Sequence, residues 1–292
     1  MLSPAAFDES GFPFGSGERH LNAVPLPRAL GVRWEGLRPG PDGEGPVARM
    51  RLPCRPALCT PGGALDLRVV AAVLDQSGAP ACYAARASTG ITATLSLQLD
   101  FHAAPEPGRD IVVDARCLAT DGASALVAGE ARHDGGPVIA RLSGRYVVGL
   151  GPGRASSSDD PPERRAEQSA RHADARAPEA ASFAALLALC PQADALVLEF
   201  QPWQVGSVAL PALHGGVVAA GLMSAAANAV PAEARELSLR QLSLQYLRAA
   251  QAETTHFRAA CVQAGRRAVH VSAAATQQGG TRHVAAMQAL FA

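Results

Sequence analysis

Two stretches of the chain carry groups that could act on a carbonyl compound. Gly215 and Gly216 begin an apolar run with helical character, and a helix start offers free backbone N–H groups and the positive end of the helix dipole. Such donors suit the oxyanion of a carbonyl under attack. Asp75 lies at the edge of the buried stripe of a second apolar run, where desolvation would raise its pKa towards that of a useful base. It could then activate water or attack the carbonyl itself.

These two runs are copies of one another. The tetrapeptide Val-Val-Ala-Ala occurs at residues 69–72 and again at residues 217–220, which aligns Asp75 with Met223. Each run precedes a strand that ends in an aromatic residue, a strand that holds a cysteine, and a Gly-Gly hairpin. These are Phe101, Cys117 and Gly135-Gly136 in one copy, and Tyr246, Cys261 and Gly279-Gly280 in the other. Self-similarity of this kind indicates an internal duplication.

The composition predicts two domains and gives no indication of a strongly charged binding partner. The chain has 292 residues, of which 48% are hydrophobic, enough for two apolar cores. Lys plus Arg and Asp plus Glu number 26 each. We therefore expect no binding to nucleic acid or to an anionic membrane surface.

The cysteines and the N-terminus indicate a cytoplasmic protein. The six cysteines lack the paired spacing of zinc or redox motifs, which favours reduced, small core residues and no metal. The N-terminus lacks a basic start followed by an apolar block, and no apolar run is long enough for a membrane span. We therefore expect a soluble protein that does not insert into membranes.

The first half contains an N-terminal arm and one domain. Residues 1–25 are rich in Pro, Gly and Ser, which predicts a flexible, loosely docked arm. Residues 26–148 form the predicted first domain, in which apolar residues at helical spacing predict a helix over 66–83. Strands are expected at 29–37, 45–52, 91–102, 110–119, 123–132 and 138–148.

A linker and a second domain follow. Residues 149–181 have almost no bulky apolar side chain, which predicts a disordered linker with some nascent helix over 163–176. Residues 182–292 form the second domain. We expect a short helix at 183–189, strands at 195–200, 205–210 and 238–246, and the long helix after His214.

Several motifs resemble those of the hotdog-fold acyl-CoA thioesterases. The resemblance is to the phenylacetate-degradation-type thioesterase family and to the amino-terminal half of the long-chain, tandem-hotdog acyl-CoA thioesterases. In the second half it is carried by His214-Gly215-Gly216, Tyr246-Leu247-Arg248 and Gly265-Arg266-Arg267. Leu74-Asp75 and Gly144-Arg145-Tyr146 carry the resemblance in the first half. It implies an α+β fold of two tandem hotdog domains, each an antiparallel sheet wrapped around one long helix, which form an intrachain pseudo-dimer.

The resemblance also implies one composite site. In the family, a carboxylate on one unit's helix faces the Gly-Gly helix start of the other unit, and a Ser or Thr on the next strand helps to hold water. The first half supplies Asp75 and Thr94, where the second has Met223 and Leu239. The second half supplies residues 214–216, with His214 in a positioning role.

The same resemblance implies that coenzyme A is part of the substrate, without a separate cofactor. The cationic groups expected for its phosphates are Arg248, Arg266 and Arg267. Two family features lack a counterpart. An Asn ahead of the His-Gly-Gly motif has no match near Val208, and a Gln of the last strand has none at Ser143.

Each assignment has a structural alternative. Asp75 could be a solvated helix residue or a loop cap, and Thr94 is what strand propensity alone would supply. Gly215 and Gly216 could serve only close packing. Arg266 and the arginine after it are typical of a solvated hairpin.

Two functions from different classes therefore follow. One is hydrolysis of an acyl-CoA thioester at the composite site, and the other is non-catalytic binding of acyl-CoA or an acyl chain. A hydratase is disfavoured, since it would need an Asp and a His together on one domain, whereas Asp66 and His214 lie in different halves. The length of the acyl chain, its aliphatic or aromatic nature, and association of tandem units into a homo-oligomer stay open.

Overall fold

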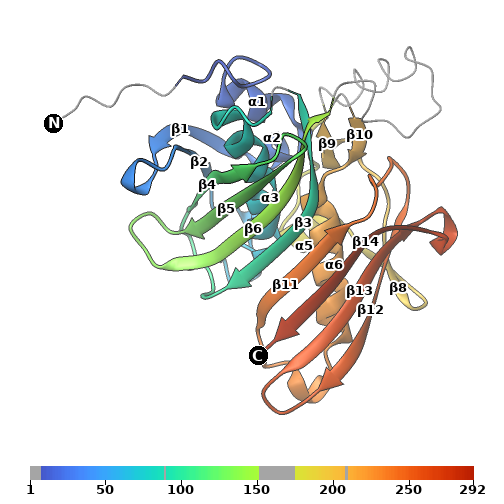
Figure 1. Ribbon diagram of the computed structural model, residues 1–292. Helices are drawn as coiled ribbons and strands as arrows, with labels where there is room; N and C mark the ends of the chain where they lie inside the picture. Colours follow the sequence, from blue (N-terminus) through green and yellow to red (C-terminus); the bar gives the residue numbers. More distant parts are fainter. Residues whose placement is uncertain (1–7, 89, 151–174, 208–209) are drawn as a thin grey trace.

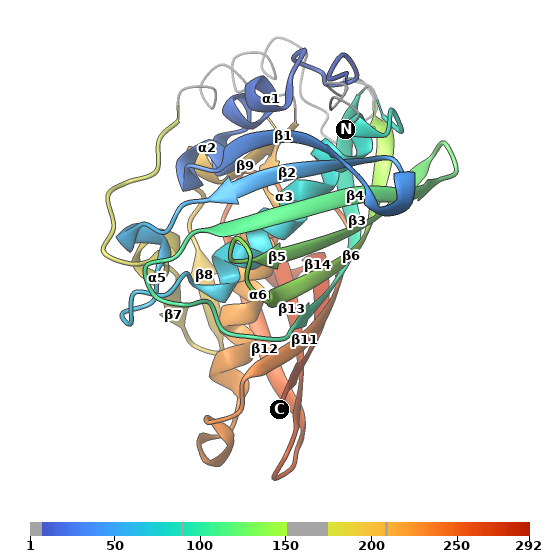
Figure 2. The same ribbon diagram turned by 90° about the vertical axis from the view of Figure 1, so that its left-hand side faces the viewer.

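A computed structural model describes residues 8–88, 90–150, 175–207 and 210–292. The predicted α+β hotdog architecture is confirmed: each half is a six-stranded antiparallel sheet curved around one long helix (Figures 1 and 2). The halves join edge to edge into one sheet. Its strand order is β1-β2-β4-β5-β6-β3-β11-β14-β13-β12-β8-β7.

The elements of the first half are two short helices, six strands and the long helix α3. The helices are α1 (Gly17–Ala23), α2 (Pro25–Leu30) and α3 (Leu67–Ala84), with 3-10 turns at Pro41–Gly43 and Pro56–Leu58. The strands are β1 (Arg33–Pro39), β2 (Pro46–Leu52), β3 (Ile91–Phe101), β4 (Ile111–Thr120), β5 (Ser124–Arg132) and β6 (Val138–Leu150).

The second half has the same plan with an added hairpin. Its helices are α5 (Phe183–Leu187) and α6 (Gly215–Ala229), with 3-10 turns at Pro202–Gln204, Ala232–Ala234 and Gln278–Gly280. Its sheet strands are β7 (Cys190–Gln192), β8 (Ala195–Leu198), β11 (Leu239–Tyr246), β12 (Thr255–Ala264), β13 (Val269–Gln277) and β14 (Arg282–Phe291), and β9 (Val205–Ser207) pairs with β10 (Leu210–Leu213).

The junction of the halves is an antiparallel pairing of β3 with β11. Gln98 lies opposite Ser243, and Leu97 lies opposite Leu244. When Phe101 is aligned with Tyr246, Gln98 is the residue equivalent to Ser243. A strand that pairs with its own copy at equivalent residues places a pseudo-two-fold axis at the junction, as in an isologous dimer interface.

The two halves do not have separate apolar cores, which corrects the sequence-based expectation. The helices α3 and α6 contact each other, and the buried side chains of both halves form one continuous cluster. The cause is the composition of the helices: Val69, Ala72 and Leu74 of α3 and Val217 and Ala220 of α6 are all buried. Each helix is apolar on more sides than its own sheet can cover.

The N-terminal arm also differs from the expectation. Residues 17–30 form α1 and α2, and Phe12, His20 and Leu21 are buried. The expected first strand begins only at Arg33, because α2 runs to Leu30. Helices this short show no clear periodicity in the sequence. The arm contacts β1 and, through α2, also contacts β9 of the second half.

Other expectations on the linker and the cysteines have mixed outcomes. Most of the expected linker, and the nascent helix within it, lies outside the described residues. All six cysteines are free thiols; Cys59 and Cys82 are buried as expected of core residues, whereas Cys190 is exposed. No helix in the described part of the chain combines the length and the apolarity that crossing a bilayer requires.

Candidate active site

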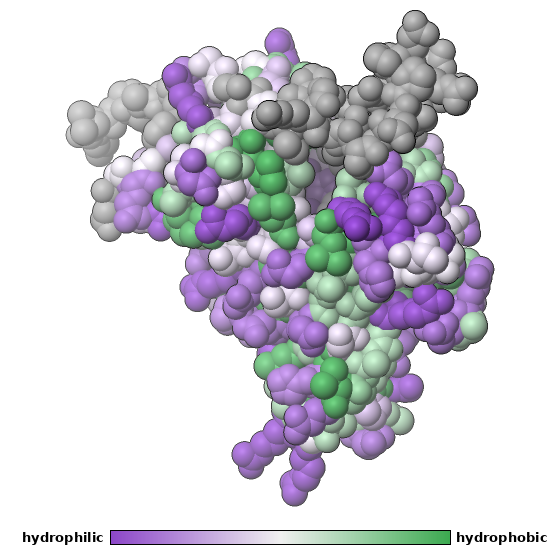
Figure 3. Space-filling view, turned by 45° about the vertical axis from the view of Figure 1, so that its right-hand side comes forward, coloured by the Kyte–Doolittle hydropathy of each residue, from purple (hydrophilic) through white to green (hydrophobic). Residues whose placement is uncertain are grey.

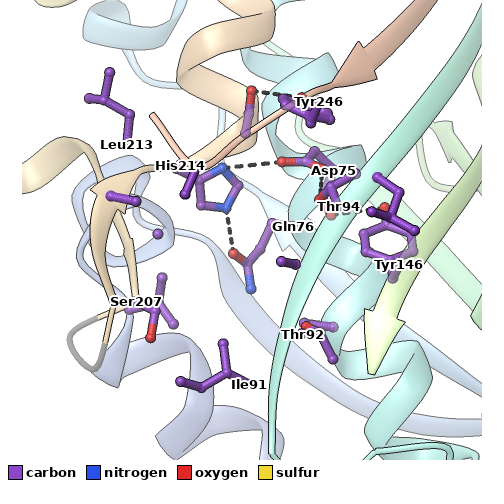
Figure 4. A pocket seen from close by; sticks show the side chains of 18 of the residues that line it. Asp75, Gln76, Ile91, Thr92, Thr94, Tyr146, Ser207, Leu213, His214 and Tyr246 are labelled. Carbon is purple, nitrogen blue, oxygen red and sulfur yellow. Dashed lines mark hydrogen bonds and ion pairs between the residues drawn. The ribbon is translucent and has the colours of Figure 1, made fainter. Parts of the chain in front are cut away.

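Asp75 of the first half lies against the start of α6 in the second half (Figure 4). Its side chain is buried, with 3% of the residue exposed. The Thr94 hydroxyl on β3 donates a hydrogen bond of 2.8 Å to Asp75 Oδ1. His214, the N-cap of α6, places Nδ1 3.3 Å from Asp75 Oδ2. Residues from both halves therefore meet at one carboxylate.

The environment of Asp75 favours its protonated form. Burial raises the pKa of Asp75 to about 7, and hydrogen bonds from Thr94 and from the Gly216 backbone lower that pKa in part. Desolvation has the larger effect because the carboxylate lies among apolar helices and has no cationic partner in the described chain. A carboxyl with a pKa near neutrality can both accept and release a proton at physiological pH.

His214 is held as a neutral imidazole between the two halves. The Gly216 N–H donates to His214 Nδ1 at 2.8 Å, so this nitrogen is an acceptor and the ring proton lies on Nε2. Nε2 is 2.8 Å from Gln76 Oε1 on α3. Burial lowers the pKa of His214 to about 4, which keeps the ring uncharged near neutral pH. The ring thus links α6 to α3, in keeping with a positioning role.

The two glycines have different environments. A Cβ atom on Gly215 would lie 2.6 Å from Asp75 Oδ2, and one on Gly216 would lie 2.5 Å from Ala72 Cα. The Gly216 N–H is already engaged by His214, so the expectation that both glycines offer free donors is corrected. The Gly215 N–H has no hydrogen-bond partner among the described residues. It is therefore the free donor at the start of α6.

Three residues near the site did not emerge from the sequence as site residues. Gln76 holds His214, the Tyr146 hydroxyl donates to the Asp75 carbonyl at 3.1 Å, and the Tyr246 hydroxyl donates to the Gly215 carbonyl at 2.8 Å. Gly78 makes room for the Tyr146 ring, since a Cβ atom there would lie 2.0 Å from that ring. The available sequence signal was that both tyrosines lie on expected strands, and Tyr246 is the last residue of β11.

A cavity of about 670 Å³ opens beside these groups and is lined by both halves. Asp75, Thr94 and Gly215 line it, and Phe14, His20 and others of the N-terminal segment form another part of its wall. Two further lining residues, Leu95 and Leu247, are 37% and 54% exposed. Apolar residues gather along the middle of the face shown in Figure 3. The lining is thus apolar with a few polar groups, which is typical of a small-molecule site.

The pseudo-symmetric counterpart of this site lacks the same groups. Met223 replaces Asp75, Asp66 replaces His214 and Arg68 replaces Gly216. The Arg68 guanidinium forms an ion pair with Asp66 at 2.5 Å and donates to the Ser224 hydroxyl at 2.9 Å. Ser224 is the equivalent of Gln76. A bridge between α3 and α6 is therefore retained, but it contains no carboxylate facing a glycine helix start.

The three candidate arginines do not lie together. Arg248 lines the cavity. Arg266 and Arg267 lie in the exposed turn between β12 and β13, beside Val269, which pairs with Phe291. Tyr246 lies at the other end of the same sheet region, opposite Ala285. The structure therefore does not bring Arg266 and Arg267 to this cavity, because the turn lies at the far end of the strands.

Part of the chain is similar in sequence to a known protein family. Residues 201–292 match a family model described as the acyl-CoA thioesterase N-terminal domain. No curated protein matches the chain significantly.

Solved structures match both halves together at low sequence identity. A protein described as an oleoyl thioesterase from Lactobacillus plantarum is 12% identical with a TM-score of 0.56, over 87% of this chain and 98% of that one. A protein described as thioesterase II from Thermobifida fusca is 15% identical with a TM-score of 0.54, over 92% and 97%. The 12:0-ACP thioesterase from Umbellularia californica is 12% identical with a TM-score of 0.56, over 84% and 94%. The chain therefore has a double hotdog fold, and residues 201–292 are similar to the acyl-CoA thioesterase N-terminal domain family.

Proposed function

We propose that this protein hydrolyses acyl-CoA thioesters at a single site between its two hotdog domains. The observation that carries the proposal is the placement of Asp75 against Gly215, with a free N–H at the helix start and an apolar cavity alongside. A carboxylate base and an oxyanion donor on the same cavity are the two groups that acyl transfer to water needs.

The proposed reaction uses the groups as they lie. The thioester carbonyl oxygen accepts a hydrogen bond from the Gly215 N–H, which with the α6 dipole stabilises the developing oxyanion. Asp75, held by Thr94, takes a proton from water as the new C–O bond forms. The C–S bond then breaks, and the proton on Asp75 passes to the leaving thiolate. Attack by Asp75 itself, followed by hydrolysis of the anhydride, uses the same geometry.

The remaining groups support binding and position. We propose that Arg248 at the cavity contacts the coenzyme phosphates. We further propose that His214 and Gln76 hold the start of α6 in register with Asp75. The free cysteines fit a reducing compartment, so we propose that the protein acts in the cytoplasm.

We expect kcat/KM to rise with pH and to level off above about 7, because only ionised Asp75 is a base or a nucleophile and burial raises its pKa to about 7. Below this value the rate should fall roughly tenfold per pH unit. His214 is neutral through this range, since its pKa is lowered to about 4. Thr94→Val removes a hydrogen bond that lowers the pKa of Asp75, so the inflection should move to higher pH. Steady-state rates measured across the range would contradict the assignment if they showed no inflection near neutrality.

The proposal is tested by a screen of acyl-CoAs of several chain lengths, aliphatic and aromatic, with detection of the released thiol. The same acyl groups on N-acetylcysteamine report what the nucleotide contributes. The same groups on acyl carrier protein test a second carrier, since the relative from Umbellularia californica is a 12:0-ACP thioesterase. We expect hydrolysis of at least one acyl-CoA series. Tight binding of acyl-CoA without any thiol release would instead favour the alternative function, non-catalytic binding of acyl-CoA.

A further inference from the structure

The cavity beside Asp75 extends along one face of α3 in the first half. Asp75, Ala79 and Tyr83 all line it, and residues four apart lie on the same face of a helix. On β3, which runs alongside, Thr94 donates to Asp75, and Thr92 is hydrogen-bonded to Tyr83. Figure 4 shows Thr92 farther along β3 than Thr94 from the start of α6. This part of the cavity therefore has α3 and β3 as its two long walls.

The N-terminal segment, which ends with α1, closes this part of the cavity at Tyr83. His20 and Tyr83 both line the cavity, are 5% and 3% exposed, and have ring centroids 5.0 Å apart. The buried Phe12 packs against both rings, with centroids 6.4 and 5.7 Å away. Glu9 holds the segment on β1 by accepting a hydrogen bond of 2.9 Å from Trp34 Nε1. An end wall of two buried rings, His20 and Tyr83, therefore closes the cavity here.

This end wall is not part of the duplicated unit. Helix α5 is the counterpart of α2, since each contacts the 3-10 turn that precedes the other half's long helix. No helix equivalent to α1 occurs among the described residues of the second half. Ala227 of α6 is the equivalent of Ala79, and it is exposed, whereas Ala79 is partly covered. The closed end is therefore a feature of the first half and its N-terminal segment.

The chemistry of the lining favours an acyl chain in this part of the cavity. Between Asp75 and the end wall the lining groups are apolar or already hydrogen-bonded. The ring of His20 is uncharged, because burial lowers its pKa to about 4, and both of its nitrogens are shielded. Arg248, the one arginine or lysine among the described lining residues, comes from the second half. A phosphate-bearing coenzyme therefore fits the second-half side, and an alkyl chain fits the first-half side.

We propose that the end wall limits the acyl chain to about six to ten carbons. The inference rests on the proposed function and adds a substrate class, linear acyl thioesters of medium chain length. Along α3, Tyr83 lies eight residues after Asp75, which is roughly 12 Å at 1.5 Å per residue. Along β3, Thr92 lies two residues before Thr94, which is roughly 7 Å. At roughly 1.2 Å per bond of an extended chain, these lengths hold about six to ten carbons.

The test measures kcat/KM for linear acyl-CoAs from butanoyl to palmitoyl. We expect the unmodified protein to prefer about six to ten carbons and to lose roughly tenfold or more with palmitoyl-CoA. Ala79→Leu adds bulk midway between Asp75 and the end wall, so kcat/KM for decanoyl-CoA should fall relative to butanoyl-CoA by roughly tenfold or more. Ala227→Leu is the matched control, because it makes the same change at the exposed, equivalent position of α6 outside the lining. It should leave the chain-length profile unchanged.

A second variant changes the profile in the opposite direction. His20→Ala removes one ring of the end wall without breaking a hydrogen bond, so kcat/KM for lauroyl-CoA and myristoyl-CoA should rise relative to decanoyl-CoA. Melting temperatures show that each variant is folded. Active, folded Ala79→Leu and His20→Ala proteins with the profile of the unmodified protein would overturn this inference alone.

Binding separates this inference from the proposed function. Calorimetry with alkyl-CoA thioethers, which cannot be hydrolysed, measures the chain-length preference without the reaction. We expect the tightest binding at about six to ten carbons and a shift to shorter chains in Ala79→Leu. That result in a protein that hydrolyses no acyl-CoA would overturn the proposed function and retain the chain-length limit.

Discussion

Asp75→Asn should reduce kcat/KM for acyl-CoA by roughly a hundredfold to ten-thousandfold. The amide has nearly the size of the carboxyl but cannot accept the proton of water or attack the carbonyl. Its amide oxygen can still accept the hydrogen bond that the Thr94 hydroxyl donates to Asp75 Oδ1, so the junction of the halves should persist. Acyl-CoA binding should change little, because the interaction removed acts in the chemical step.

The matched control for this change is Asp66→Asn. Asp66 occupies the counterpart site and caps α3 by accepting from the Arg68 N–H, and Asn is an equally good N-cap. Hydrolysis should therefore be retained. Full activity in Asp75→Asn would exclude the proposed mechanism, and equal losses in both variants would indicate a structural effect rather than a chemical one.

Gly216→Ala should destabilise the fold by about 1–3 kcal/mol or more. The added methyl group would lie 2.5 Å from Ala72 Cα and 3.1 Å from its carbonyl oxygen, so backbone rather than a movable side chain blocks it. One kcal/mol corresponds to roughly 2–4 °C in a protein near this size, so the melting temperature should fall by several degrees. Thermal and urea unfolding of the purified protein measure the effect.

A second glycine provides the comparison for Gly216→Ala. Gly265→Ala lies in the exposed turn after β12, where the nearest atom to the new methyl group is Ala268 O at 3.4 Å. It should be close to neutral. If Gly216→Ala were as stable as Gly265→Ala, the close contact of α3 with α6 would not contribute as the structure indicates.

The proximity of Asp75 to Gly215 could be predicted because both residues have local sequence signals. Gly215 and Asp75 were each identifiable from position on a helix, and the duplication showed that each half lacks what the other keeps. Thr94 could be placed once Phe101 fixed the strand register. These inferences needed only spacing within one element and the alignment of two copies.

Other parts of the site depend on contacts between distant segments. Gln76 and His214 are 138 residues apart, and Tyr146 contacts the Asp75 carbonyl across 71 residues. Hydrophobic periodicity within one element does not indicate contacts between residues so far apart in the sequence. His20 lies in a helix of seven residues, too short to show a buried face. Arg266 carries the right charge, but charge alone does not tell which end of a strand a turn occupies.

The pairing of β3 with β11 also determines how the activity should respond when the protein is diluted. Two separate hotdog units would form the junction only above their dissociation constant, so a site shared between them would vanish as the protein becomes dilute. Here both strands belong to one chain, and the encounter is intramolecular. Specific activity per molecule should therefore be independent of protein concentration, down to the lowest levels at which the folded chain persists.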